Sequence, residues 1–103
     1  MKIGITSKLS ERKWGDDYYK KAKSFGFSYH DFNMSNTNTP LYFDNDELIK
    51  KEKALADAAS ATIWQVHGPW RWPPQDDTAE RRAERAEKMA ISIRAARLLG
   101  AKY

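Results

Sequence analysis

Two segments of this chain share one pattern, in which the end of a helix, a glycine and a short turn lead into a β-rich run. In residues 24–29, Gly26 follows Phe25 at the position where helices commonly end in the left-handed conformation. Residues 98–103 repeat this pattern around Gly100 and stop after its first strand residue. Because a helix that leads into a strand is one step of a repeating βα unit, we expect the front part of a larger fold.

The composition is typical of a folded domain with a small core. The 103 residues make one ordinary domain at most, and 41% hydrophobic with 13% aromatic residues argue against disorder. No apolar run is long enough to span a bilayer, and residues 1–6 indicate a strand rather than a signal peptide. The absence of cysteine excludes a disulfide framework and a thiolate metal site. We therefore expect a soluble cytoplasmic protein.

The net charge of +4 does not by itself indicate a nucleic-acid-binding protein. Most of the basic residues alternate with acids along the expected helices, which is typical of a solvated helix face. Arg81, Arg82 and Arg85 fit this description. Glu84 and Lys88 have the spacing of an ion pair between neighbouring helical turns.

Strand-like and helix-like segments alternate three times. The expected strands lie near 2–6, 29–34 and 61–66, and the expected helices lie near 16–25, 45–59 and 78–99, all within one domain over residues 1–103. Asp16 and Asp17 offer a cap for the first helix, and capping-box spacing precedes the other two, at Asp44 with Glu47 and at Asp77 with Glu80.

The fold class that follows is α/β, with three consecutive βα units and parallel strands, because strands joined by helices pair in parallel through right-handed crossovers. Open doubly wound sheets and closed (βα)8 barrels share this rhythm, but a doubly wound sheet is apolar on both faces. Here the alternation assigns Ile3, Ile5, Phe32, Trp64 and Val66 to an apolar face, and Gly4, Thr6, Tyr29, Asp31, Asn33, Gln65 and His67 to a polar face. This asymmetry favours the first part of a TIM (βα)8 barrel, with a ligand at the carboxyl ends of the strands.

Several motifs, in their order along the chain, resemble the amino-terminal part of the sugar phosphate isomerase/epimerase family. They are Lys2-Ile3-Gly4-Ile5, Ser24-Phe25-Gly26-Phe27, the acid Asp31, Val66-His67-Gly68-Pro69-Trp70 and the closing Leu98-Leu99-Gly100-Ala101-Lys102-Tyr103. The family consists of xylose isomerase-like TIM barrels and is related to the endonuclease IV type of AP endonuclease. The resemblance covers essentially the whole chain.

The resemblance implies a barrel of about 250 residues in which a divalent metal orients sugar oxygens while carboxylates move a proton. The metal would be Mn, Mg, Co or Zn, and its ligands come mainly from later strands of the family barrel, which this chain lacks. The expected chain is therefore an amino-terminal portion that contributes part of a sugar-binding pocket, is inactive alone and does not hold a metal tightly by itself.

His67 is the first candidate site residue, because it matches a pocket histidine of the family that binds metal in the endonuclease branch. A lone histidine more commonly hydrogen-bonds substrate, and that role is the favoured one for His67, with metal ligation as the alternative. Asp31 could bind a sugar hydroxyl or orient a neighbour, or it could be a solvated or salt-bridged carboxylate. His30 points to the opposite face and is expected to be structural.

Aromatic and amide side chains are expected on the loops at one end of the sheet. Trp14 and Trp70 could pack on the C–H face of a sugar while Asn33 reaches hydroxyls, with loop packing as the alternative role of the aromatic residues. Trp70, directly after His67-Gly68-Pro69, is favoured as a wall of the pocket. Further members of this group are Tyr42, Phe43, Asn36 and Asn38, whereas Trp72, next to two prolines, is expected to pack within its loop. Arg71 could meet a phosphate or a carboxylate, although an exposed position beside Asp76-Asp77 is the simpler explanation.

The sequence is compatible with three functions. The first is the amino-terminal part of a sugar phosphate isomerase/epimerase-like barrel, with a sugar or sugar phosphate as its small-molecule partner. The others are an endonuclease IV-like metal-dependent phosphodiesterase fragment and a non-catalytic oligomeric binding module. Since the isolated sheet would have open edges, self-association through those edges is expected, whereas neither a membrane nor a nucleic acid is an expected partner.

Overall fold

The computed structural model describes residues 3–7, 14–34, 45–69 and 77–103. In chain order the elements are β1 (Gly4–Ser7), the 3-10 helix η2 (Gly15–Asp17), α1 (Tyr18–Ser24), β2 (Tyr29–Asn33), α3 (Asp46–Ala58), β3 (Thr62–His67) and α4 (Ala79–Leu99). The strands form one sheet in the order β1-β2-β3, and both pairs are parallel. The prediction of an α/β fold with three βα units and parallel strands is confirmed.

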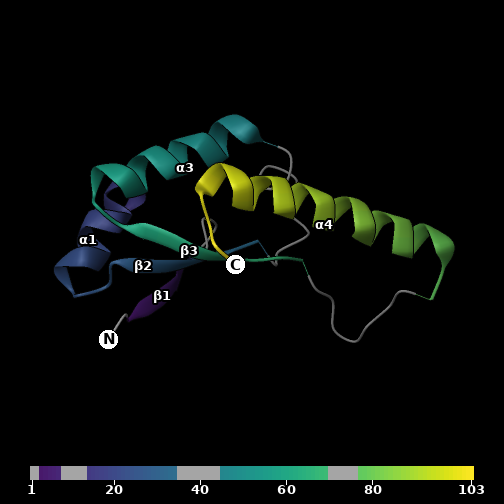
Figure 1. The fold of residues 1–103 in the computed structure, drawn as a ribbon, viewed down its shortest axis with the longest axis horizontal. Coiled ribbons are helices and arrows are strands. Elements are labelled where there is room, and N and C mark those ends of the chain that lie inside the picture. Colours follow the sequence, from purple (N-terminus) through teal and green to yellow (C-terminus); the bar gives the residue numbers. More distant parts are fainter. Residues whose placement is uncertain (1–2, 8–13, 35–44, 70–76) are drawn as a thin grey trace.

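The helices cover one face of the sheet, and the core lies between the two layers (Figure 1). Each of the five main packing elements contributes one large side chain that is at most 2% exposed; these side chains are Tyr19, Phe32, Ile49, Ile63 and Leu99. Full burial of a side chain of this size is worth about 1.5–3 kcal/mol. Among the described residues, no helix has the length and apolar character needed to cross a membrane.

A buried polar contact joins α1 to α3 inside this core. The Tyr19 hydroxyl donates to Glu52 Oε2 at 2.8 Å, and Glu52 is only 2% exposed. His30 is 1% exposed and lies edge-on against the rings of Tyr18 and Tyr19, with centroid distances of 5.7 and 4.9 Å. His30 thus faces the helices, as its place in the strand predicts.

All three helices that lead back to the sheet end with a residue of positive φ. This residue is Gly26 after α1 (φ 93°), Ser60 after α3 (φ 53°) and Gly100 after α4 (φ 71°). In each case the next amide donates to the carbonyl five residues earlier, at 2.9–3.0 Å, which is the Schellman pattern. The repeat seen in the sequence therefore has a third member, in which serine occupies the glycine position.

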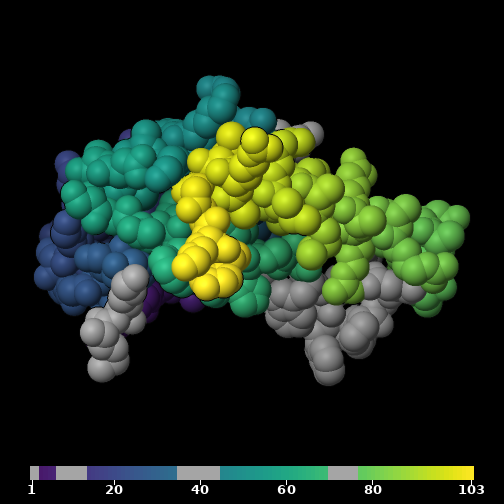
Figure 2. All heavy atoms as spheres, in the orientation of Figure 1, coloured from purple at the N-terminus to yellow at the C-terminus, as the bar shows by residue number. Residues whose placement is uncertain are grey.

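After Gly100 the chain returns to the sheet and pairs with the free side of β3. The Lys102 amide donates to the Trp64 carbonyl, and the Val66 amide donates to the Tyr103 carbonyl, both at 2.9 Å. The segment 101–103 thus occupies a fourth position in the sheet, and Figure 2 shows it at the surface beside α4.

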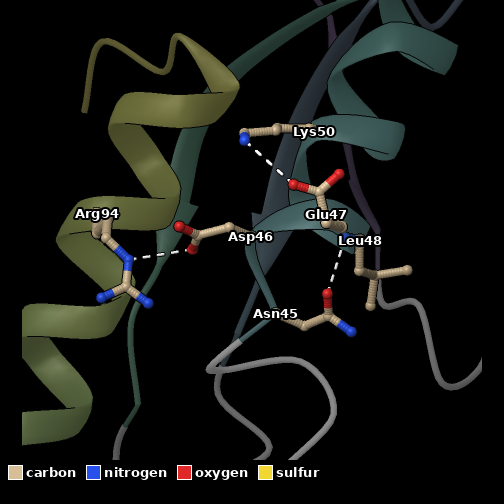
Figure 3. A network of polar contacts seen from close by, with 6 residues as sticks. All are labelled: Asn45, Asp46, Glu47, Leu48, Lys50 and Arg94. Carbon is tan, nitrogen blue, oxygen red and sulfur yellow. Dashed lines mark hydrogen bonds and ion pairs between the residues drawn. The ribbon is translucent and has the colours of Figure 1, made fainter.

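The caps of α3 and α4 each lie one residue later in the chain than the sequence predicts. Asn45 Oδ1 accepts from the Leu48 amide at 3.1 Å before α3 (Figure 3), and Thr78 Oγ1 accepts from the Arg81 amide at 3.1 Å before α4. The cap expected at Asp77 is wrong, because its carboxylate pairs with the Arg81 guanidinium instead, at 3.1 Å.

Two further caps are expected from the sequence, at Asp44 and at Asp16 with Asp17. Asp44 lies outside the described residues. The region expected as one helix from 16 to 25 divides into η2 and α1, and neither Asp17 nor Trp14 makes a capping hydrogen bond with its side chain.

Ion pairs at the surface connect neighbouring turns and neighbouring helices. Arg94 Nε of α4 lies 3.1 Å from Asp46 Oδ1 of α3 (Figure 3), with both side chains about half exposed. The pair expected between Glu84 and Lys88 is present at 2.6 Å. Exposed pairs of this kind contribute about 0–1 kcal/mol, so the Arg94–Asp46 pair adds little to the packing of α4 on α3.

A bulge in β3 changes the faces predicted from strict alternation. Ile63 pairs with His30 and Gln65 pairs with Asp31, which leaves Trp64 as an extra residue. The assignment of Trp64 to the apolar face is therefore wrong, since its ring packs at right angles on Tyr29 at 6.0 Å on the other face. Val66 stays on the helix side, opposite Phe32 and packed against the core.

Replacing Tyr19 with phenylalanine is expected to lower the free energy of unfolding by about 1–3 kcal/mol, because Glu52 would stay buried after losing a hydrogen-bond donor. Urea denaturation measures this change. Tyr103→Phe is the matched control, since Tyr103 is 67% exposed and should change stability by less than about 0.5 kcal/mol. Equal effects of the two substitutions would contradict the assigned role of the Tyr19 hydroxyl.

Substitutions at the positive-φ residues Gly100 and Ser60 should change the free energy of unfolding in opposite directions. Gly100→Ala is expected to cost about 1 kcal/mol, since the left-handed conformation disfavours a Cβ. Steric conflict adds little, because that Cβ would meet only the flexible end of Lys53, at 3.6 Å. Ser60→Gly is expected to raise stability by up to about 1 kcal/mol. Thermal unfolding that shifts in the same direction for both variants would disprove this account of the helix ends.

Candidate functional site

Polar side chains from all three strands line up on the sheet face that the helices leave open. Thr6 of β1 is the ladder partner of Asp31 on β2, and Asp31 is in turn the partner of Gln65 on β3. One step further along, Asn33 pairs with His67. Because the strands are parallel, these residues gather toward the carboxyl ends of the strands, where ligands bind in parallel α/β sheets.

Asp31 lies at the centre of this row. Its Oδ2 accepts a hydrogen bond from Thr6 Oγ1 at 3.3 Å and lies 3.5 Å from His67 Nδ1. The Asp31 side chain is 17% exposed, whereas that of His67 is 54% exposed. The Met34 amide donates to the His67 carbonyl at 2.8 Å, which fixes the backbone of this histidine at the strand end. The carboxylate is thus held in place, while the imidazole is open to an incoming molecule.

A hollow of about 350 Å³ adjoins the polar row on the same face. It is lined by residues of all three strands, namely Gly4, Ile5, Thr6, Tyr29, His30, Asp31, Trp64 and Gln65. Gly4 sits close to β2, since a Cβ there would be 3.3 Å from the Tyr29 carbonyl oxygen. The hollow therefore combines two aromatic walls with a carboxylate, an amide and a hydroxyl, which can accept and donate hydrogen bonds around a small polar molecule.

The structure brings together three of the five predicted site residues. Asp31, Asn33 and His67 lie on neighbouring strands of the open face. Trp14 does not join them, because its ring stacks on Tyr18 at 6.4 Å and lies 6.2 Å from Phe25. Trp70 lies outside the described residues, as do Tyr42, Phe43, Asn36, Asn38, Arg71 and Trp72.

Sequence reasoning missed Trp64 and Tyr29 as walls of the hollow. Strand alternation puts Tyr29 on the correct face without indicating a role for it, and it puts Trp64 on the wrong face because alternation does not predict the bulge. The adjacent pair Ile63-Trp64 is the one signal in the sequence, since two consecutive large apolar residues in a strand with one polar face are compatible with a bulge between them.

The row supplies two of the side chains that bind divalent metals in proteins. Asp31 and His67 are two groups with ligand chemistry, whereas zinc sites use at least three protein ligands. In the described part of the chain, no group of three or more histidine, cysteine, aspartate or glutamate side chains could hold a metal ion.

Comparison of the chain with family models, with curated proteins and with solved structures gives no match. The geometry of the open face is thus the main basis for assigning a function, and the resemblance to sugar phosphate isomerases rests on the sequence motifs alone.

Proposed function

We propose that the open face of the sheet binds a sugar, and that the chain is the amino-terminal portion of a sugar phosphate isomerase/epimerase-like TIM barrel. The single observation that carries this proposal is the row Thr6–Asp31–His67 beside a hollow walled by Tyr29 and Trp64. The motifs in the sequence, which include Asp31 and His67, support the same assignment.

A sugar fits the chemistry of this face better than an apolar ligand or a flat aromatic one. Its hydroxyls match the carboxylate of Asp31, the amide of Gln65 and the hydroxyl of Thr6, while its C–H surface matches the rings of Tyr29 and Trp64. The hollow of about 350 Å³ is at the small end of the range found for ligand pockets, as suits a monosaccharide.

In this proposal the residues bind and orient the sugar, and Asp31 contributes most. Its carboxylate accepts from a hydroxyl of the sugar while Thr6 keeps one of its oxygens in position. His67 lies at the rim, where its imidazole meets a hydroxyl or a neighbouring oxygen. Proton transfer on a carbon atom of the sugar would be the task of the later strands of the family barrel, which the resemblance implies and the given sequence does not include. The cytoplasm remains the proposed location.

Asp31→Asn is expected to weaken sugar binding at least tenfold, because a hydrogen bond to a charged acceptor is worth about 1.5–3 kcal/mol. Titration calorimetry with a panel of pentoses, hexoses and their phosphates measures the affinities. Asp57→Asn is the matched control, since Asp57 pairs with Lys53 on the exposed side of α3 and should leave binding unchanged.

Two results would contradict the proposal. One is the absence of binding for every sugar of the panel by a chain that is folded by circular dichroism. The other is salt-dependent binding of abasic DNA that is tighter than the binding of any sugar of the panel, which would favour the endonuclease-like alternative. A preference for phosphorylated over free sugars would define the substrate class within the proposal.

A further inference from the structure

The segment after α4 brings a lysine ammonium to the aromatic side of the hollow. Lys102 Nζ lies over the ring of Trp64, 5.2 Å from its centroid, and 5.7 Å from the centroid of the Tyr103 ring. Trp64 also lines the hollow beside Asp31. Lys102 is thus a neighbour of the candidate site, through the aromatic wall that Trp64 provides.

Backbone hydrogen bonds to β3 fix this position. The Lys102 amide donates to the Trp64 carbonyl at 2.9 Å, and the Tyr103 carbonyl accepts from the Val66 amide at 2.9 Å. The positive φ of Gly100, 71°, ends α4 and turns the chain back toward the sheet just before this pairing. A lysine that is held at its backbone and over two rings loses less conformational entropy on binding an anion than a lysine that moves freely in solvent.

Lys102 differs from the lysines on the helices because it has aromatic partners in place of an acid. The ammonium groups of four helix lysines each lie 2.6–3.2 Å from a carboxylate oxygen, and these are Lys50, Lys51, Lys53 and Lys88. Among the described residues no ion pair joins Lys102 to an acid, and the residue is exposed. An aromatic face attracts an ammonium without neutralising its charge, so this ammonium keeps its capacity to bind an anion.

We propose that Lys102 binds the carboxylate of a sugar acid, such as a uronate, whose hydroxyls meet the row around Asp31. This inference rests on the proposed function, since it names the class of sugar that the open face takes. It concerns the face of the sheet and not its edge. The proposed barrel turns the face that carries Trp64 inward, and further strands would follow beyond residues 101–103.

The spacing of the strands fits a single sugar ring between the two charged groups. Asp31 is on β2 and residues 101–103 pair with the far side of β3, so two strand spacings, roughly 9.6 Å in total, separate their backbones. Side chains stand roughly perpendicular to a sheet, and a hydrogen bond of about 2.8 Å at each end then leaves roughly 4 Å. Such a span matches a ring hydroxyl and a carboxylate on the same sugar ring.

The charge of the site favours a carboxylate over a phosphate. One ammonium offsets the single negative charge of a carboxylate, whereas a phosphate monoester carries about −1.5 to −2 charges at pH 7. The carboxylate of Asp31 lies on the same face and would repel the excess negative charge. We therefore expect a sugar acid to bind more tightly than the corresponding sugar phosphate.

The experiment is titration calorimetry of the 103-residue chain with glucose, galactose and mannose, and with the uronate and the phosphate monoester of each. At least one uronate is expected to bind tenfold or more tightly than its parent hexose, because hydrogen bonds between charged groups are the stronger kind. This preference should shrink as the salt concentration rises, since salt screens the charge of an exposed ammonium.

Two variants and a control assign the preference to Lys102. Lys102→Met keeps a long side chain over the Trp64 ring and removes the charge, so the ratio of the uronate and hexose affinities should fall to about one. Lys102→Arg keeps the charge and should keep a preference for the uronate. Lys50→Met is the matched control, because Lys50 pairs with Glu47 on α3, which covers the opposite face of the sheet, and this variant should keep the full ratio.

Equal affinities for the uronates and their hexoses in the unaltered chain would overturn this inference and leave the proposed function standing. A preference that survives Lys102→Met would also overturn it, since the carboxylate would then bind elsewhere. Tighter binding of the phosphate monoesters would overturn the choice of a sugar acid. Absence of binding for every sugar and sugar derivative would overturn the proposed function itself.

Discussion

The packing of α1, α3 and α4 against a single face of a parallel sheet is the constraint on which the rest of the structure depends. Phe32 and Ile63 reach from the strands into this layer and meet Tyr19, Ile49 and Leu99 from the helices. The opposite face of the same strands is left to polar and aromatic residues. Since parallel strands alternate in side-chain direction, this one arrangement both makes the core and presents the row around Asp31.

Much of the fold follows from patterns that have a local physical cause. The glycines at 26 and 100 mark helix ends because few other residues adopt positive φ without strain, and the alternation of apolar and polar residues in β2 identifies its two faces. Ser60 escaped this logic, because serine seldom adopts a positive φ and its presence therefore does not indicate a helix end. The helix caps were displaced by one residue because aspartate, asparagine and threonine are all competent caps and stand next to one another.

The residues of the candidate site could likewise be predicted from the sequence only in part. Asp31, Asn33 and His67 could be placed on one face from strand periodicity alone, and the structure puts them on adjacent strands. Trp64 could not, because the bulge that turns its ring toward Tyr29 depends on how β3 pairs with β2. Trp14 packs on Tyr18 and Phe25 rather than in the site. The residues around it in the sequence do not predict which of these two environments it occupies.

The central claim is that the row around Asp31, on the sheet face opposite the helices, binds a sugar. Titration of the chain with the sugar panel, followed residue by residue by NMR chemical shifts, tests it most directly. The account predicts that the amide signals of Thr6, Asp31 and Gln65 move, while those of Lys53 and Asp57 on α3 stay in place. Shifts confined to α3, or no shifts with any sugar, would contradict it.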